Sequence, residues 1–270
     1  MSKKIVTIQD LSCFGQCSLT VALPVISALG VEAAVLPTSL LSNHTMFSAW
    51  TKCDLDAEVE SIFDMWQKQN ISYDGLVTGY IGNSNLVNII IKNIKNLTSG
   101  LVIIDPAMAD NGKLYPGFDD DYVNSISNLC MQADIILPNL SEACLLLGKE
   151  YKAFTEKECQ QIVLELAKKY SCNVVLKGVT KCKKLGVMVL ENGEIKTYYH
   201  KKMERSYHGT GDIYASVFAG MLINGYDTLT SASVAADFVV KCIQDTMQDE
   251  SHFYGVHFEK NMHLLGKYIK

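Results

Sequence analysis

Hydrophobic residues recur along the chain with two alternating periods, which predict strands separated by helices. Short apolar runs predict strands at residues 4–9, 31–37, 75–78, 100–105, 134–138 and 173–177. Helical spacing predicts helices at residues 18–29, 56–69, 84–97, 122–132, 141–147 and 155–170. Because apolar strands that alternate with helices form a mostly parallel sheet covered on both faces, we expect an α/β protein.

After residue 180 the pattern changes. Two alternating segments at 185–190 and 194–199 flank Glu191-Asn192-Gly193, and an Asn-Gly pair between alternating segments indicates a hairpin. Only helices are expected after it, at 212–224, 228–248 and near 258–268. The hairpin predicts antiparallel strands at one edge of the sheet. Because no linker or internal repeat interrupts the pattern, residues 1–270 are expected to form a single domain.

The composition argues against several classes of protein. The chain has 270 residues, 48% of them hydrophobic, and a net charge of −5, which argues against a general nucleic-acid binder. No apolar run reaches the roughly 18 residues that a membrane span needs. The first apolar segment, Ile5–Ile8, is too short for the core of a signal peptide. We therefore expect a cytoplasmic globular protein with no membrane or nucleic-acid partner.

Neither the cysteines nor the histidines have the spacing of a metal site. The nine cysteines are scattered and contain no Cys-x-x-Cys pair, so most are expected to be reduced and packed. His252, His257 and His263 are five and six residues apart, which does not place them on one helix face. The sequence therefore predicts that these histidines are surface residues.

Polar side chains follow the predicted strands, where parallel sheets bind their ligands. Ser12 follows the first strand, Thr78-Gly79-Tyr80 the third, Asp105-Pro106 the fourth and Pro138-Asn139-Leu140-Ser141-Glu142 the fifth, while Lys177 ends the sixth. Loops need turn residues, which explains the glycines. The need for turn residues explains less well why carboxylates and amides recur at one edge of the sheet.

The most informative segment is Gly209-Thr210-Gly211-Asp212, directly before an apolar helix. Two glycines expose successive backbone N–H groups, and the N-terminus of a helix binds anions. The alternative is an ordinary helix cap, since Thr and Asp are common capping residues. The segments typical of P-loop and Rossmann nucleotide sites are absent.

These residues fit phosphoryl transfer, which needs an oxyanion cradle, a divalent ion and a base near the attacking hydroxyl. Gly209–Gly211 form the candidate cradle, and Asp212 is the candidate base. Asp105 and Glu142 are candidate ligands of Mg²⁺, which prefers hard oxygen donors. Lys177, or alternatively Lys181, is a candidate phosphate contact.

The chain resembles the pyridoxal/pyridoxamine (vitamin B6) kinases of the ribokinase-like superfamily from about Ile8 to about Glu259. The segments that carry the resemblance are Ser42-Asn43-His44-Thr45, Thr78-Gly79-Tyr80, Asp105-Pro106-Ala107-Met108-Ala109-Asp110, Pro138-Asn139-Leu140-Ser141-Glu142 and Gly209-Thr210-Gly211-Asp212. The resemblance implies a three-layer α/β/α fold. It also implies that ATP phosphorylates the 5′-hydroxymethyl group of pyridoxal, pyridoxine or pyridoxamine in the cytoplasm.

The resemblance assigns a role to each candidate residue. Asp212 takes the hydroxyl proton, and Gly209 and Gly211 hold the transferred phosphoryl group. The remaining roles are ring binding (Ser12, His44, Thr45 and Tyr80), nucleotide binding (Asn139, Lys177 and Thr210) and Mg²⁺ binding (Asp105 and Glu142). The family often uses K⁺ as well, and we expect a homodimer by the same resemblance.

One departure from the family pattern bears on turnover. The family usually has Asp-Pro-Val-Met-Gly-Asp, whereas this chain has Ala109 in place of the glycine. Because Ala resists positive φ, we expect a stiffer flap over residues 110–115. Ala109 is also the one sequence feature that points to a catalytically weak B6-binding protein as an alternative. A hydroxymethylpyrimidine kinase of the same superfamily is a second alternative, because the cradle and the base are the same for both ring substrates. A sugar kinase is disfavoured, because the expected ring pocket lacks the polar array that a sugar needs.

Overall fold

A nine-stranded sheet forms the centre of the computed structural model, which describes residues 3–270. The strand order is β11-β10-β9-β8-β5-β4-β1-β2-β3, and β9 through β2 run parallel to one another. The antiparallel strands β10, β11 and β3 occupy the two edges. The strand bounds are β1 Lys4–Ser12, β2 Glu32–Leu41, β3 Lys52–Asp54, β4 Tyr73–Thr78, β5 Thr98–Ile104, β8 Ile135–Ile136, β9 Asn173–Lys181, β10 Lys184–Glu191 and β11 Glu194–Lys201.

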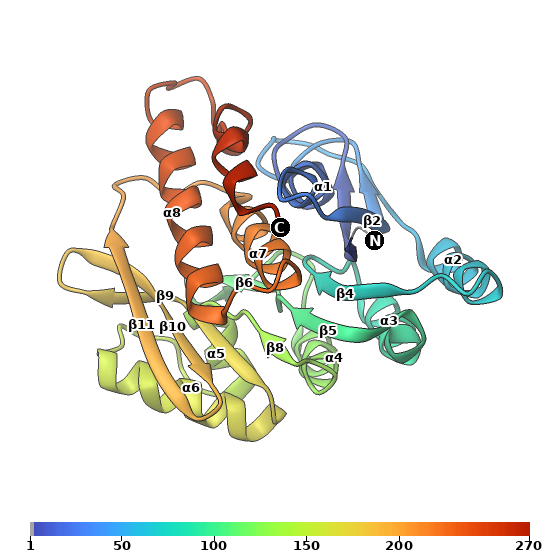
Figure 1. The fold of residues 1–270 in the computed structure, drawn as a ribbon, viewed down its shortest axis with the longest axis horizontal. Helices are drawn as coiled ribbons and strands as arrows, with labels where there is room; N and C mark the ends of the chain where they lie inside the picture. Colours follow the sequence, from blue (N-terminus) through green and yellow to red (C-terminus); the bar gives the residue numbers. More distant parts are fainter. Residues whose placement is uncertain (1–2) are drawn as a thin grey trace.

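Helices cover both faces of this sheet, as Figure 1 shows. One face carries α1 (Leu19–Ala28), α7 (Thr210–Ile223) and α8 (Thr228–Thr246), which pack in one apolar core around Phe218. The other face carries α2 (Asp56–Lys68), α3 (Ser84–Leu97), α4 (Asp120–Cys130), α5 (Leu140–Leu147) and α6 (Glu156–Tyr170), over a second core. This three-layer arrangement confirms the predicted α/β fold.

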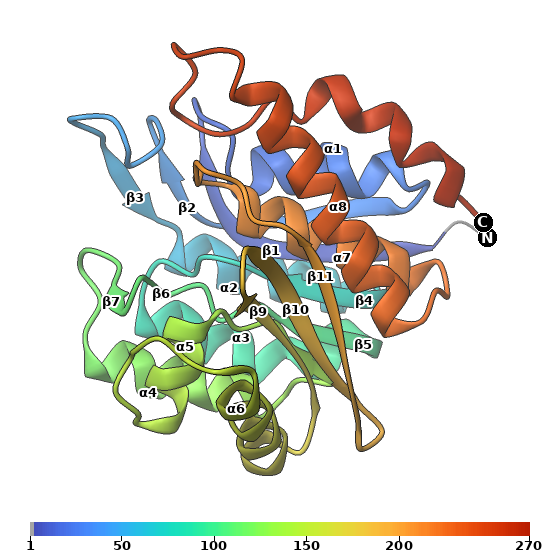
Figure 2. The same ribbon diagram turned by 90° about the vertical axis from the view of Figure 1, so that its left-hand side faces the viewer.

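The structure extends the predictions at several places. Strand β3 and the small hairpin of β6 (Ala109–Asp110) and β7 (Lys113–Leu114) were not expected from the sequence. Figure 2 shows that hairpin outside the main sheet and next to α5. The predicted helix near 258–268 is wrong in type, because the chain forms two short 3₁₀ segments, Glu259–Leu264 and Gly266–Tyr268. Such 3₁₀ segments are short because their hydrogen-bond geometry is poorer than that of an α-helix.

Within residues 3–270, no helix is both long and apolar enough to span a membrane. All nine cysteines in this part of the chain are free thiols. Five of them are buried, and burial in apolar surroundings disfavours the charged thiolate.

Candidate active site

A cavity of about 570 Å³ opens where β5, β8 and β9 end and α7 begins. Such an edge is where parallel α/β sheets bind ligands. The cavity brings together residues from five segments that are far apart in sequence. Of the residues predicted from the sequence, its lining includes Asp105, Asn139, Glu142, Lys177, Gly209, Thr210, Gly211 and Asp212.

The N-terminus of α7 is open toward this cavity. Gly209, which precedes the helix, has φ +75°. A Cβ at this position would lie 2.0 Å from the carbonyl oxygen of Gln16, so both the conformation and the space require glycine. No side chain in the described part of the chain caps α7, whereas Asn139 caps α5. The amides of its first turn therefore remain available to an anion, which disfavours the ordinary-cap alternative.

Asp212 lies in the first turn of α7, and a backbone group of another loop holds its carboxylate. Its Oδ2 accepts a hydrogen bond of 2.8 Å from the backbone N–H of Ser18, in the loop between β1 and α1. Burial raises the pKa of Asp212 to about 7, and the nearby carboxylates of Asp10 and Asp105 act in the same direction. A carboxyl group with such a pKa can take up a proton near neutral pH, as a general base must.

Two buried carboxylates and one lysine also line the cavity. Lys177 Nζ lies 2.6 Å from Asp105 Oδ2, and Glu142 accepts a hydrogen bond of 2.7 Å from the N–H of Asn139. Burial raises the pKa of Asp105 and raises that of Glu142 to about 8. One ammonium group does not balance two carboxylates, so this oxygen-rich pair fits a divalent cation such as Mg²⁺. The alternative Lys181 instead pairs with Glu156 at 2.9 Å, outside the cavity lining.

Three hydrogen bonds within the protein hold the side chain of Asn139. Its Oδ1 accepts hydrogen bonds from the N–H groups of Ser141 and Glu142, and its Nδ2 donates to the carbonyl of Ala109 at 2.8 Å. Thr210 Oγ1 likewise donates to the carbonyl oxygen of Tyr207. These two side chains therefore shape the wall of the cavity, and Asn139 also connects α5 to the β6–β7 hairpin.

Ala109 does not strain that hairpin. It lies buried in β6, and the left-handed positions of the turn are Asn111 at φ +50° and Gly112 at φ +76°. Position 109 does not adopt a positive φ in this conformation, so the backbone gives no reason for the stiffer flap that was expected from Ala109. The hairpin is also joined to α5 through Gly112, whose N–H donates to Ser141 Oγ at 2.8 Å.

None of the four residues expected at the vitamin ring belongs to the lining of this cavity. Ser12 is buried and donates to Asp10 Oδ2 at 3.2 Å, and the charge of Asp10 acts on the pKa values of both Tyr80 and Asp212. Asp10, which follows the first predicted strand but was assigned no role from the sequence, is thus near both Tyr80 and the candidate base.

His44 and Thr45 approach the site from the segment after β2. The ring of His44 lies 5.3 Å from that of His208, which lines the cavity. Burial, together with His208, lowers the pKa of His44 to about 4, so its ring is neutral at physiological pH. Its Nδ1 accepts the N–H of Met46, which leaves Nε2–H as a donor. Thr45 is exposed on the same loop.

Further residues line the cavity that the sequence did not reveal. They are the segment 203–206 after β11, Tyr214 from α7, and an apolar wall from β10 and α8, while Tyr115 of the expected flap also belongs to the lining. The hydroxyl of Tyr214 is buried and has no hydrogen-bond partner within residues 3–270. No local signal could have found this wall, because its apolar residues have the same pattern as the core.

Comparison with known proteins assigns this chain to a family. A family described as phosphomethylpyrimidine kinase matches residues 8–257. A pyridoxal kinase of Pasteurella multocida is 25% identical over 93% of this chain and 91% of its own length. The pyridoxal kinase structure from Lactobacillus plantarum has a TM-score of 0.91 at 31% identity, covering 97% of this chain and 96% of that one.

A second solved structure is similar to the same extent. This Bacteroides thetaiotaomicron protein, named as a candidate phosphomethylpyrimidine kinase and crystallised in one form with pyridoxal, has a TM-score of 0.93 at 32% identity. The match covers 98% of this chain and 96% of that one. The predicted resemblance is thereby confirmed. The chain belongs to the phosphomethylpyrimidine kinase family of the ribokinase-like superfamily, and it is a kinase homologous to the pyridoxal kinases.

Proposed function

We propose that the protein transfers the γ-phosphoryl group of ATP to the 5′-hydroxymethyl group of pyridoxal, pyridoxine or pyridoxamine. The observation that carries this proposal is the open N-terminus of α7 beside Asp212, whose pKa is raised to about 7. The pyridoxal named in the Bacteroides thetaiotaomicron structure supports the choice of substrate class. The similarity to the Lactobacillus plantarum pyridoxal kinase points the same way.

In this proposal Asp212 accepts the proton of the attacking hydroxyl. Its Oδ2 is occupied by the N–H of Ser18, so Oδ1 is the oxygen that faces the substrate. As the proton leaves, the hydroxyl oxygen bonds to the γ-phosphorus, and the bond between that phosphorus and the ADP oxygen breaks. The free amides at Gly209–Gly211 donate to the phosphoryl oxygens, where negative charge accumulates.

The carboxylates of Asp105 and Glu142 would hold Mg²⁺, directly or through water. This ion supplies charge neutralisation at the phosphates. Lys177, which is held against Asp105, is placed to donate to a phosphate oxygen from the same wall. Asn139 and Thr210 act by shaping the nucleotide side of the cavity.

The vitamin ring is assigned to the region bounded by Ser12, His44, Thr45 and Tyr80. Tyr80 stacks on Phe118 at a centroid distance of 5.2 Å, which fixes a flat aromatic surface there. His44 offers an Nε2–H donor, and the hydroxyl of Ser12, which donates to Asp10, can still accept a hydrogen bond. A flat surface with a few donors suits a heteroaromatic ring better than a sugar.

The same features allow a hydroxymethylpyrimidine kinase, and the description of the matched family favours it as the second candidate. The test is to incubate the protein with MgATP and each B6 vitamer or hydroxymethylpyrimidine, and to measure ADP and phosphorylated ring. We expect a higher kcat/KM for a B6 vitamer. A higher kcat/KM for the pyrimidine would establish the second candidate.

Binding without turnover is the remaining outcome of this test. Tight vitamer binding without ADP formation would mean a binding protein instead of a kinase. Asp212→Asn provides the control, because it should keep ligand binding and lose product. We also propose a homodimer on the basis of the family resemblance, and sedimentation that gives a single 29.9 kDa species would contradict it.

A further inference from the structure

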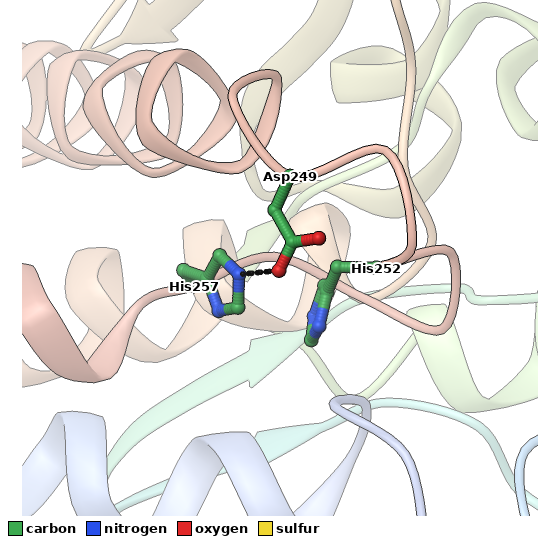
Figure 3. Close-up of side chains that lie close together, drawn as sticks. All are labelled: Asp249, His252 and His257. Carbon is green, nitrogen blue, oxygen red and sulfur yellow. Dashed lines mark hydrogen bonds and ion pairs between the residues drawn. The ribbon is translucent and has the colours of Figure 1, made fainter.

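Three metal-ligating side chains meet just beyond the end of α8, outside the lining of the cavity. They are Asp249, His252 and His257, and one ligand atom of each lies within 4.8 Å of the others. Figure 3 shows the two imidazole rings close together and the Asp249 carboxylate directed at the ring of His257. His252 is only 7% exposed, so the prediction that it is a surface residue is wrong. The irregular loop after α8 brings these three side chains together, although their sequence spacing does not fit one helix face.

The ligand atoms of this group lie near enough to one another to reach a single ion. His257 Nε2 lies 3.1 Å from Asp249 Oδ2, and the centroids of the two imidazole rings are 4.0 Å apart. Around a tetrahedral ion with bonds of about 2.0–2.2 Å, neighbouring ligand atoms lie roughly 3.3–3.5 Å apart. Small side-chain rotations would therefore bring the three ligand atoms to bonding distance.

An outer layer of hydrogen bonds holds His252 in one tautomer. Gln16 Nε2 donates to Glu259 Oε1 at 2.6 Å, so Gln16 Oε1 is the atom that faces His252 Nε2, also at 2.6 Å. The amide oxygen can only accept, so His252 Nε2 carries the proton and Nδ1 keeps its lone pair. A ligand histidine whose other nitrogen donates to an oxygen is the usual arrangement at metal sites.

We propose that Asp249, His252 and His257 form a binding site for a divalent transition metal of the Zn²⁺ type, with water completing its coordination. Two imidazoles and one carboxylate suit Zn²⁺ and Co²⁺, whereas Mg²⁺ prefers oxygen ligands alone. The site is distinct from the pair Asp105 and Glu142.

The position of the site gives it a structural role. Gln16 lies in the loop between β1 and α1, and its N–H donates to the carbonyl of Tyr254 at 3.0 Å. Two residues later, Ser18 holds Asp212. A metal bound by Asp249, His252 and His257 would cross-link the segment after α8. Because His252 bonds to Gln16, the metal would also stabilise the loop between β1 and α1, which holds the candidate base. The site does not depend on which substrate the kinase uses.

The test is a titration of chelator-treated full-length protein with Co²⁺, followed by its visible ligand-field absorption. We expect one equivalent to bind with an N/O-ligated spectrum and to be displaced by Zn²⁺. Asp249→Asn and His257→Asn should each weaken binding by about 100-fold, and Gln16→Ala by about 10- to 100-fold, the usual effect of losing an outer hydrogen bond. Thermal unfolding with Zn²⁺ should show a raised Tm for the wild-type protein and little change for His257→Asn.

Two matched controls separate this site from others. His263→Asn changes an exposed histidine outside the group, and Glu142→Gln alters the candidate Mg²⁺ site; both should bind Co²⁺ as the wild type does. A thiolate charge-transfer band in the near ultraviolet would show that cysteines bind the metal and would overturn the proposal. Unchanged Co²⁺ affinity in His257→Asn, or no binding by the wild type, would overturn it as well.

Discussion

Replacing Asp212 by Asn should make the protein more stable while it strongly slows phosphoryl transfer. The carboxyl group of Asp212 is buried beside Asp10 and Asp105, which raises its pKa from 3.8 to about 7. The folded protein therefore retains a proton that the unfolded chain releases above about pH 4. The free energy of unfolding consequently falls as the pH rises from about 4 to about 7, and this contribution is constant above pH 7.

The magnitude follows from the size of the shift. About three pKa units correspond to an upper limit of about 4 kcal/mol, at roughly 1.4 kcal/mol per unit. Asn removes this cost, and its Oδ1 can still accept the N–H of Ser18. We therefore expect Asp212→Asn to gain about 1–4 kcal/mol at pH 8 and progressively less toward pH 4. Because the base is lost, kcat should fall by about 10² or more.

Urea unfolding of both proteins between pH 5 and pH 8 measures the gain, and initial rates with the best substrate measure kcat. Asp64→Asn, an exposed carboxylate on α2, is the matched control and should change neither quantity. In the wild type, kcat should rise with pH up to about pH 7. A stability difference between wild type and Asp212→Asn that is independent of pH would refute the reasoning, as would an unchanged kcat.

Three further changes test other parts of the site. Lys177→Met leaves Asp105 buried without its partner and should cost about 3–5 kcal/mol, measured by urea unfolding; a loss below 1 kcal/mol would mean that the pair is solvent-screened. Gly209→Ala forces a Cβ against the carbonyl of Gln16 and should lower both Tm and kcat, so normal activity in this variant would argue against the tight turn. Ala109→Gly should leave kcat unchanged, since Ala109 does not have a positive φ, and a rise in kcat would restore the stiff-flap hypothesis.

Patterns among residues that are close in the sequence determined most of the secondary structure. The periods of apolar residues predicted α3 at its observed bounds, Ser84–Leu97, and the Asn-Gly turn predicted the β10–β11 hairpin. The glycines before Asp212 predicted an open helix N-terminus, because the conformation of a turn depends on neighbouring residues alone. Carboxylates at strand ends predicted one edge of the sheet as the site, since parallel strands bring those ends together.

Only the tertiary structure decided which of these groups touch. Lys177 pairs with Asp105 across 72 residues, and Gln16 bonds to Glu259 across 243. Such contacts depend on how the crossover connections order the strands in the sheet, and the periodicity of apolar residues does not contain that information. For the same reason His252 and His257 looked unrelated in the sequence, yet an irregular loop packs them around Asp249. The pKa of Asp212 also arises only after folding, because burial and the nearby carboxylates raise it.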